Sequence, residues 1–370
     1  MKGIRRLFHN YRYLAVGVLA SCITVYSSLV FSQPQDFHTS DKLDVKIGQM
    51  LIFGTHSVSK DLLREIKKYH IGGILLHKND FQSPSDLLNL TNHLQKASEI
   101  PLLIASDEEG GLVTRLTPFK GFIYKHSAET MGERGLEYTN NAATSIATEL
   151  SLHGVNLNFA PVVDVAINPK NTAIVTKGRS FSDDPDDVSQ LATEFVNAHS
   201  AQNILTTLKH FPGHGSSMED SHHAPVDITK TWSDIELTPF RNMIKNGSAH
   251  LIMMGHLLNT EYDSQHPASL SEKVHQILRV QLKFDGVVIS DDFQMKAITK
   301  NYKLKETIKL AINAGTDILL FGQIQEYYPI SKIHGIIKKL VKNNEVSMKR
   351  INESYQRIIE LKQKANLISK

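Results

Sequence analysis

The sequence of 370 residues has little cysteine and almost no excess of charge. Cys22 is its only cysteine, so the chain cannot form an internal disulfide and offers no cluster of thiolates to a metal ion. Lysine and arginine total 41 against 38 acidic residues, a net charge of +3, and no long basic run accompanies them. We therefore expect no nucleic-acid partner. Apolar residues at 41% and charged residues at 21% are typical of an ordinary globular protein.

The first 32 residues differ from the rest of the chain. Four basic side chains precede a stretch, 14–31, that is almost free of charge; they are Lys2, Arg5, Arg6 and Arg12. This order is typical of a secretory signal peptide or an N-terminal membrane anchor. Residues 19–22, Leu-Ala-Ser-Cys, also resemble a bacterial lipobox, which would place a lipid on Cys22. We predict an exported protein, periplasmic or membrane-anchored, in which 33–40 form a linker.

Eight short apolar runs, rich in leucine or β-branched residues, recur after the linker. They are 50–53, 73–76, 102–105, 155–159, 204–208, 251–254, 286–289 and 317–321. Segments of helical periodicity separate them, for example 140–152, 188–200 and 304–314. Continuous apolar strands that alternate with helices indicate a parallel sheet covered on both faces. Eight of them predict an α/β fold, a TIM-like (β/α)8 barrel, with 41–370 as a single catalytic domain.

Two points leave the fold prediction open. The first run, 50–53, fits a helix as well as a strand, and a doubly wound open sheet is the alternative architecture. Against that alternative, no glycine fingerprint follows an early strand. The segment 348–364 places its apolar residues on one helical face, so we expect an outer helix that packs on the barrel.

Polar side chains stand at or just past the ends of six of these runs: His77, Asp107, Asp164, Lys209, His256 and Asp291. In a barrel the C-terminal ends of the strands converge on one face, where active sites lie. Several ionisable residues in the same relative place therefore predict a site at that face.

The segment 209–225, KHFPGHGSSMEDSHHAP, concentrates ionisable side chains between glycines and prolines. Its glycines and prolines predict a loop that leaves the end of a strand. Asp220 stands two residues before His222, and a histidine oriented by an acid can use its other ring nitrogen for proton transfer. His214 and His223 are interpreted as structural or surface groups. The alternative is a polar surface loop that happens to be rich in histidine.

Two further segments carry candidate site residues. Asp291 and Asp292 follow the buried run at 286–289, and a carboxylate there can be a nucleophile, a metal ligand or a helix cap. The two acids can also divide these roles, with Asp291 in the site and Asp292 as the cap. In SDEEGGLVTR, Asp107 and Arg115 provide an acceptor and a donor fork suited to sugar hydroxyls. Asp164 and Arg179 are additional candidates.

Together these segments resemble glycoside hydrolase family 3, specifically its β-N-acetylglucosaminidase branch. The resemblance rests on DEEGGLVTRL, NFAPVVDV with GRSFSDDP, KHFPGHG with DSH, PASLS and LKFDGVVISDDFQM. These motifs occur in the order of the family and cover nearly all of the chain from Gln49 onward. The resemblance implies a TIM-like barrel and a retaining, two-step mechanism.

Residue by residue, the resemblance implies that Asp291 is the nucleophile, which forms a glycosyl-aspartate. It implies that His222, paired with Asp220, acts as acid and then as base. Retaining glycosidases ordinarily use two carboxyl groups, and in this branch a histidine takes the place of the second. The residues implied to bind N-acetylglucosamine are Asp107, Arg115, Arg179, Lys209 and His210. We expect neither a metal nor a cofactor.

Further expectations concern the substrate and the partners. We expect a peptidoglycan-derived carbohydrate or muropeptide as substrate, membrane contact only through the N-terminal segment, and a monomer. Three positions depart from the family pattern. Relatives often have arginine where this chain has Leu112, commonly an acid in place of Ser216, and usually a small residue in place of Gln294.

Three other functions remain open. One is a metal-dependent barrel hydrolase that uses His210, His214, His222 and Asp291, although HFPGH does not place two histidines one helical turn apart. Another is an exported carbohydrate-binding member of the family without turnover. The last is a β-glucosidase of the same family, although such relatives usually take the acid/base from a second domain.

Overall fold

The computed structural model describes residues 42–55, 58–221, 224–324 and 326–369. The chain divides into two units, Met1–Asp36 and Phe37–Lys370, and the fold is that of the second unit. The predicted leader, the linker at 33–40 and the candidate lipid site at Cys22 lie outside the described residues, so these remain predictions. Among the helices in the described ranges, none is long and apolar enough to cross a membrane.

Eight parallel strands form the sheet that the eight apolar runs predict. They are β1 (Leu51–Gly54), β2 (Gly73–Leu75), β3 (Leu103–Ser106), β4 (Leu157–Asn158), β5 (Leu205–Phe211), β7 (Leu251–Met254), β9 (Val287–Ser290) and β10 (Leu319–Phe321). Their spatial order is β10-β1-β2-β3-β4-β5-β7-β9. A bridge between Ile289 and Ile318 connects the two end strands, so the sheet closes into a barrel. The predicted fold class is confirmed, and the ambiguous first run is the strand β1.

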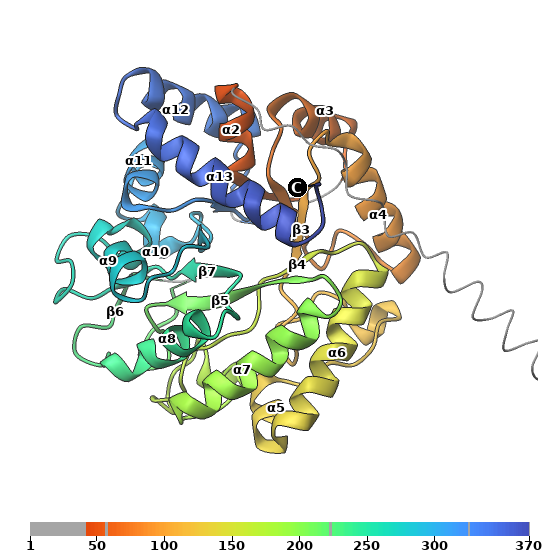
Figure 1. Cartoon of the computed structure of the whole chain (residues 1–370), viewed down its shortest axis with the longest axis vertical. Helices are drawn as coiled ribbons and strands as arrows, with labels where there is room; N and C mark the ends of the chain where they lie inside the picture. Colours follow the sequence, from red (N-terminus) through yellow and green to blue (C-terminus); the bar gives the residue numbers. More distant parts are fainter. Residues whose placement is uncertain (1–41, 56–57, 222–223, 325, 370) are drawn as a thin grey trace, which may run out of the picture. The chain divides into compact units, whose positions relative to one another are not determined.

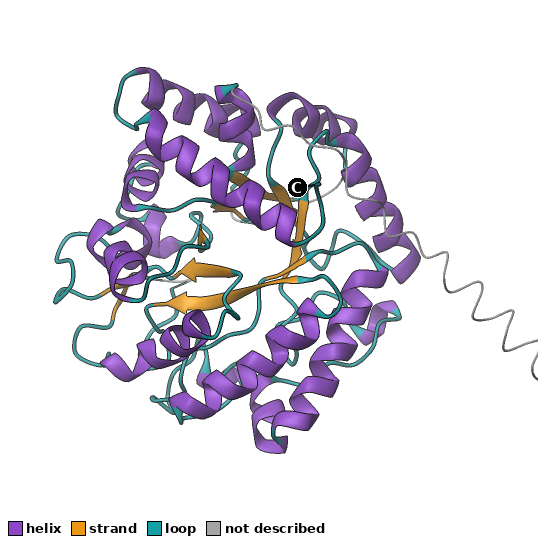
Figure 2. Cartoon of the chain, in the orientation of Figure 1, coloured by secondary structure: helices purple, strands orange, loops and turns teal. Residues whose placement is uncertain are grey.

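Helices surround the strands, as Figures 1 and 2 show. They are α2 (Leu43–Gln49), α3 (Lys60–Tyr69), α4 (Pro84–Ala97), α5 (Ala128–Arg134), α6 (Leu136–Leu152), α7 (Pro185–Ser200), α8 (Thr238–Lys245), α9 (Glu272–Gln276), α10 (Lys296–Thr299), α11 (Leu304–Ala314), α12 (Ile330–Lys342) and α13 (Met348–Lys364). Single 3-10 turns are η1 (Pro118–Lys120), η2 (Val175–Lys177), η3 (Asp234–Leu237) and η4 (Ala268–Leu270), and η5 (Ile277–Gln281) is a π-helical turn. The helices predicted at 140–152, 188–200, 304–314 and 348–364 are confirmed.

Local sequence explains where several of these helices begin. Ser83 and Asp184 accept hydrogen bonds from backbone N–H groups in the first turns of α4 and α7, and a proline follows each cap. Ser347 caps α13 in the same way. The strands between the helices are buried on both faces, which is why their sequences read as continuous apolar runs.

A buried lysine closes the end of the barrel opposite the predicted site. Lys362 of α13 donates from Nζ to Gln49 Oε1 at 2.7 Å, to the Gly72 carbonyl at 3.1 Å and to the Pro101 carbonyl at 2.6 Å. These three acceptors precede β1, β2 and β3. Burial lowers the pKa of Lys362 to about 7.

A second polar cluster lies where β10 begins. Asp317 is fully buried and accepts from Arg279 at 2.6 Å and from Arg350 at 2.5 Å, and Arg357 lies 3.4 Å away. Burial raises the pKa of Asp317, but the three guanidinium groups outweigh that effect and hold it below its ordinary value. The cluster therefore fixes α13 to the N-terminal ends of β9 and β10.

Candidate active site

The strand register aligns the predicted site residues at one end of the barrel. Phe211 of β5 pairs with Met254 of β7, and Met254 pairs with Ser290 of β9. Residues 209–210 come directly before this row and Asp291 directly after it. The C-terminal ends of the strands therefore carry the candidate residues, as expected for a barrel enzyme.

The position of Lys209 and His210 corrects one prediction. The sequence places both in a loop, whereas the structure places them inside β5, which extends to Phe211. Backbone pairing explains the longer strand, because Lys209 forms a parallel β-bridge with Val162 and Phe211 pairs with Met254 of β7. The loop begins only at Pro212.

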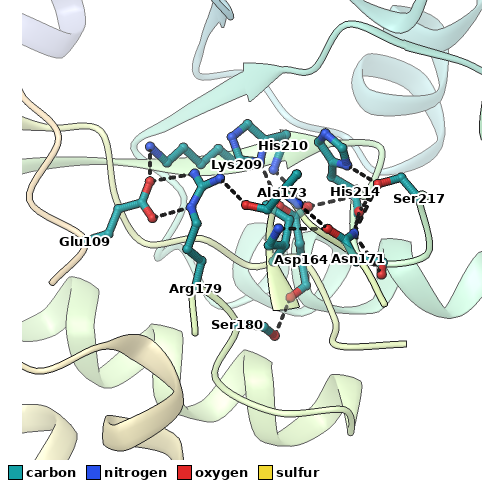
Figure 3. Close-up of polar contacts among 12 residues, drawn as sticks. Glu109, Asp164, Asn171, Ala173, Arg179, Ser180, Lys209, His210, His214 and Ser217 are labelled. Carbon is teal, nitrogen blue, oxygen red and sulfur yellow. Dashed lines mark hydrogen bonds and ion pairs between the residues drawn. The ribbon is translucent and has the colours of Figure 1, made fainter. Parts of the chain in front are cut away.

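Four of the predicted substrate-binding residues form one ionic cluster with Glu109; they are Asp107, Arg115, Arg179 and Lys209. Figure 3 shows the part of it around Glu109, Arg179 and Lys209. Lys209 Nζ lies 3.1 Å from Asp107 Oδ1 and 2.6 Å from Glu109 Oε1. Arg179 contacts both oxygens of Glu109, at 2.7 and 2.8 Å. Arg115 Nη2 lies 2.7 Å from Asp107 Oδ2. Glu109 thus connects residues from the loops after β3 and β4 to β5.

Each acid in this cluster is kept ionised by the cations beside it. Burial raises the pKa of Asp107, but the Lys209 and Arg115 cations outweigh it and hold that pKa well below its usual range. Glu109 experiences the same opposition between burial and its two cations, Arg179 and Lys209, and its pKa falls to about 2. The two carboxylates are therefore ionised at neutral pH, so they act as acceptors only. Arg115 retains 24% of its side-chain exposure, so this edge of the cluster faces solvent.

Sequence reasoning missed Glu109. A signal was available, because Asp107 and Glu109 stand two residues apart directly after β3, and an extended backbone directs such a pair to the same side. Glu108, between them, has a different role. It accepts from the backbone N–H groups of Arg115 at 2.7 Å and Leu116 at 3.0 Å, so it shapes the loop that presents Arg115.

His210 is oriented by Asp164, a residue that the sequence analysis singled out without a firm role. His210 Nδ1 lies 2.7 Å from Asp164 Oδ2, and the backbone N–H groups of His210 and His214 donate to Asp164 Oδ1 at 3.0 and 2.8 Å. Burial raises the pKa of Asp164, yet His210 and these hydrogen bonds bring it below its ordinary value. The carboxylate therefore fixes the imidazole of His210 and the start of the following loop together.

His214 has the contacts of a loop-structuring residue. Its Nδ1 lies 2.6 Å from Ser217 Oγ, and its carbonyl accepts from Asn171 Nδ2 at 2.7 Å (Figure 3). Burial lowers the pKa of His214 to about 4, so the ring is neutral at physiological pH. Asn171 also donates to the Gly215 carbonyl, at 3.2 Å, and thereby ties this loop to the segment after β4.

The two adjacent acids after β9 have different surroundings. Asp292 Oδ1 accepts from the N–H groups of Gln294 at 3.0 Å and Gly322 at 2.9 Å, and therefore organises the turns after β9 and β10. Both residues are partly exposed, and Asp291 Oδ1 accepts from the N–H of Asp292 at 2.8 Å. Asp292 does not cap a helix as predicted, because α10 begins after Met295 without a side-chain cap, and the placing of Asp291 in the site stays a prediction.

The predicted proton-transfer pair lies partly outside the described residues. Asp220 Oδ2 lies 3.1 Å from Lys177 Nζ, at the end of η2 and two residues before Arg179. The described residues do not include His222 and His223. The pairing of His222 with Asp220 therefore stays a prediction.

The three departures from the family pattern occupy different environments. Leu112 is 76% exposed, whereas Ser216 and Gln294 are buried. The Gln294 side chain accepts from the N–H of Gln323 and donates to the Glu326 carbonyl, so it holds the turn after β10.

A metal-dependent hydrolase needs several ligands grouped around one ion. Across the described ranges, no three histidine, cysteine, aspartate or glutamate side chains are grouped so that they could hold a metal ion. The Nδ1 atoms of His210 and His214 are engaged by Asp164 and Ser217. The expected lack of a metal or cofactor remains a prediction.

Comparisons with known proteins agree with this architecture. The model for the glycosyl hydrolase family 3 N terminal domain matches residues 42–361. The chain is 33% identical over 333 residues to Beta-hexosaminidase A of Pseudoalteromonas piscicida, over 82% of this chain and 55% of that protein. It is 29% identical over 362 residues to Beta-hexosaminidase LpqI of Mycobacterium tuberculosis, over 94% of this chain and 88% of the relative.

Two solved structures have the same fold. A glycoside hydrolase family 3 β-N-acetylglucosaminidase from Paenibacillus sp. str. FPU-7 superimposes with a TM-score of 0.82 at 33% identity, over 89% of this chain and 63% of that one. A β-N-acetylhexosaminidase from Beutenbergia cavernae gives 0.81 at 27% identity, over 88% and 99%. The chain thus spans about half of the Pseudoalteromonas relative and nearly all of the Beutenbergia protein.

Proposed function

This chain belongs to glycosyl hydrolase family 3, and we propose that it is a retaining exo-β-N-acetylglucosaminidase. The observation that carries the proposal is the convergence of Asp291 and the ionic cluster of Asp107, Glu109, Arg179 and Lys209 at one end of the barrel. Such an end can hold one sugar by its hydroxyl groups while a carboxylate reaches its anomeric carbon. The names of the β-hexosaminidase relatives support the same reading.

The proposed reaction has two steps. Asp291 attacks the anomeric carbon and forms a glycosyl-aspartate, while the imidazolium of His222 gives its proton to the departing oxygen. The neutral His222 then takes a proton from water, which attacks the same carbon and releases Asp291. Two inversions retain the β configuration. Asp220 orients the imidazole and stabilises its charged form.

The ionic cluster supplies the proposed binding site. Asp107 and Glu109 accept from sugar hydroxyls, and the cations of Arg115, Arg179 and Lys209 donate to them. Because the groups already hold one another by short contacts, little side-chain entropy is lost when the sugar binds. His210, fixed by Asp164, adds a further directed contact.

We also propose the substrate class and the location. Fragments with N-acetylglucosamine linked to N-acetylmuramic acid fit an enzyme that removes terminal sugars during peptidoglycan turnover. The basic and then apolar N-terminal pattern supports action outside the cytoplasm. That the protein acts as a monomer is part of the same proposal. Fractionation that finds the protein in the cytosol would overturn the proposed location.

Hydrolysis of p-nitrophenyl N-acetyl-β-glucosaminide tests the activity and the nucleophile. We expect turnover that survives EDTA, and a loss of kcat on the order of a thousandfold or more in Asp291→Asn. The matched control is Asp285→Asn, an exposed aspartate before the other end of β9, which should keep full activity. Intact mass spectrometry should find one added sugar in the quenched wild type and none in Asp291→Asn.

Three outcomes would contradict the proposal. Full activity in Asp291→Asn removes the nucleophile, and activity lost to EDTA and restored by zinc favours the metal-dependent hydrolase. Binding of N-acetylglucosamine without turnover favours the carbohydrate-binding alternative. Products from defined muropeptides, with and without phosphate, then identify the substrate and the acceptor.

The role of His222 needs a separate test. Natural disaccharides have poor leaving groups that require protonation, whereas p-nitrophenolate does not. We therefore expect His222→Ala to lose far more kcat/KM on the disaccharide than on the aryl substrate. Equal losses on both would count against the acid role.

A further inference from the structure

Glu236 is a buried carboxyl outside the ionic cluster and plays no part in the mechanism above. It belongs to η3, directly before α8, and its side chain has no solvent exposure. The rings of Phe240 in α8 and Phe211 at the end of β5 pack 5.1 Å apart, and Trp232 Nε1 donates to the Pro212 carbonyl at 3.1 Å. These contacts fix η3 against the loop that leaves β5.

Glu236 holds the backbone of that loop directly. Its Oε2 accepts from the N–H of Gly215 at 2.9 Å and lies 3.4 Å from the N–H of Ser216. Gly213 approaches so closely that a Cβ there would lie 2.5 Å from the Cβ of Glu236, and its φ of +126° favours glycine. The carboxyl therefore touches the three residues around the turn of the loop.

Asp164 and Asn171 hold the same turn through other backbone groups. Asp164 accepts from the N–H groups of His210 and His214, and Asn171 donates to the carbonyls of His214 and Gly215. With Glu236 they form a clamp on 210–216, in which two carboxyl groups accept from backbone N–H groups of the segment. Downstream of the clamp the chain leads to Asp220, which Lys177 contacts.

We propose that Glu236 is a positioning residue for proton transfer, because it fixes the turn that precedes Asp220, the proposed partner of His222. This inference rests on the function proposed above. Glu236 does not touch the sugar, and it acts through the backbone at Gly215 and Ser216.

The electrostatics of Glu236 support a functional rather than a stabilising role. Burial raises its pKa to about 7 and the nearby charge of Asp164 adds to the rise, while the Ser216 side chain and the N–H groups of Ser216 and Gly215 oppose it. Its Oε1 has no hydrogen-bond partner among the described residues. The fold therefore keeps a carboxyl whose ionisation at neutral pH opposes stability, and such groups concentrate at functional sites.

The test compares leaving groups in two variants of Glu236. Glu236→Leu removes the acceptor and should lower kcat/KM for the disaccharide at least about tenfold more than for the p-nitrophenyl substrate, within the range of general acid catalysis. Glu236→Gln keeps an acceptor oxygen and should restore both values to within about threefold of wild type. A ratio of the two substrates that stays at the wild-type value in Glu236→Leu would overturn the proposal.

A matched control separates positioning from simple loss of stability. Asp317→Asn removes the charge of a buried carboxylate at the other end of the barrel. It should lower stability without changing the ratio of kcat/KM for the disaccharide to kcat/KM for the p-nitrophenyl substrate. If this control changes the ratio equally, the effect of Glu236 is only structural and the inference fails.

The two proposals can fail separately. A wild-type protein without turnover refutes the glycosidase function itself. Leaving-group dependence in His222→Ala but not in Glu236→Leu leaves that function intact and refutes only the role of Glu236. If Glu236→Leu does not fold, the inference depends on Glu236→Ala, which must show the same selective loss.

Discussion

Replacing Glu109 with glutamine removes the negative charge that bridges Lys209 and Arg179. The pKa of Glu109 falls from 4.5 to about 2 in the folded protein, a difference that corresponds to about 3 kcal/mol. Breaking a buried ion pair typically costs about 3–5 kcal/mol, because the remaining charges lose their partner. Both estimates lead us to expect a loss of about 3 kcal/mol in the free energy of unfolding at pH 7.

This loss of stability should appear as a lower thermal midpoint, and it should depend on pH. At about 2.1 cal/mol/K of unfolding entropy per residue, the midpoint of a domain such as 42–361 should fall by about 4–5 °C. A carboxyl with a depressed pKa stabilises the fold above its unfolded value, and this stabilisation is lost as the pH falls through the folded value. The difference between Glu109→Gln and wild type should thus be complete above pH 4.5 and shrink toward pH 2.

Urea unfolding at several pH values measures both quantities. Trp232 is the only tryptophan in the sequence and bonds to Pro212, so its fluorescence reports on the site end of the barrel. Glu345→Gln is the control, because Glu345 pairs with Lys305 at the surface and its loss should not change stability measurably. Wild-type stability of Glu109→Gln at pH 7, or a deficit that persists undiminished near pH 2, would refute the reasoning.

Three other predictions concern the remaining buried and bridging charges. Asp317→Asn should lower the unfolding free energy by about 3–5 kcal/mol in urea titrations and leave KM unchanged at 25 °C, since three arginines lose a common partner far from the site; a raised KM would contradict this. Glu236→Gln should raise the thermal midpoint at pH 8 but not below pH 4.5. Because the pKa of Glu236 is raised in the folded protein, its ionisation destabilises the fold at pH 8, and glutamine removes that destabilisation. A gain that does not depend on pH would contradict this. Lys177→Met should reduce kcat/KM for the disaccharide a few-fold. Added salt should lower kcat/KM of the wild type more than that of the variant, because the Lys177 side chain in the pair with Asp220 is 41% exposed and salt screens exposed ion pairs. Identical salt responses would contradict this.

The sequence predicts the barrel well because burial on both faces of each strand leaves an uninterrupted apolar run. It fails where pairing depends on distant partners. Lys209 and His210 read as loop because proline and glycine follow, yet pairing with Val162 and β7 extends the strand through them. The short parallel pair of β6 (Val226–Asp227) and β8 (Leu257–Leu258) has too few residues for any periodicity to appear.

The candidate site is predicted only in part for the same reason. Asp107 and Asp291 follow apolar runs directly, so the barrel fold alone places them at the C-terminal ends of strands. Glu236 stands in DIELTPF, where nothing local distinguishes it from a surface acid. Its contact with Gly215 exists only because Phe240 packs on Phe211 in the folded protein.

Lys362 has a consequence for the order in which the chain can fold. Its acceptors at Gln49, Gly72 and Pro101 lie 313, 290 and 261 residues earlier, beside the first three strands. During synthesis these strands are made long before the helix that completes their hydrogen bonding, and contacts of such separation form slowly. A chain that ends before α13 therefore leaves the Pro101 carbonyl and the Gln49 side-chain oxygen without the Lys362 donor, whereas the Gly72 carbonyl keeps the N–H of Leu103.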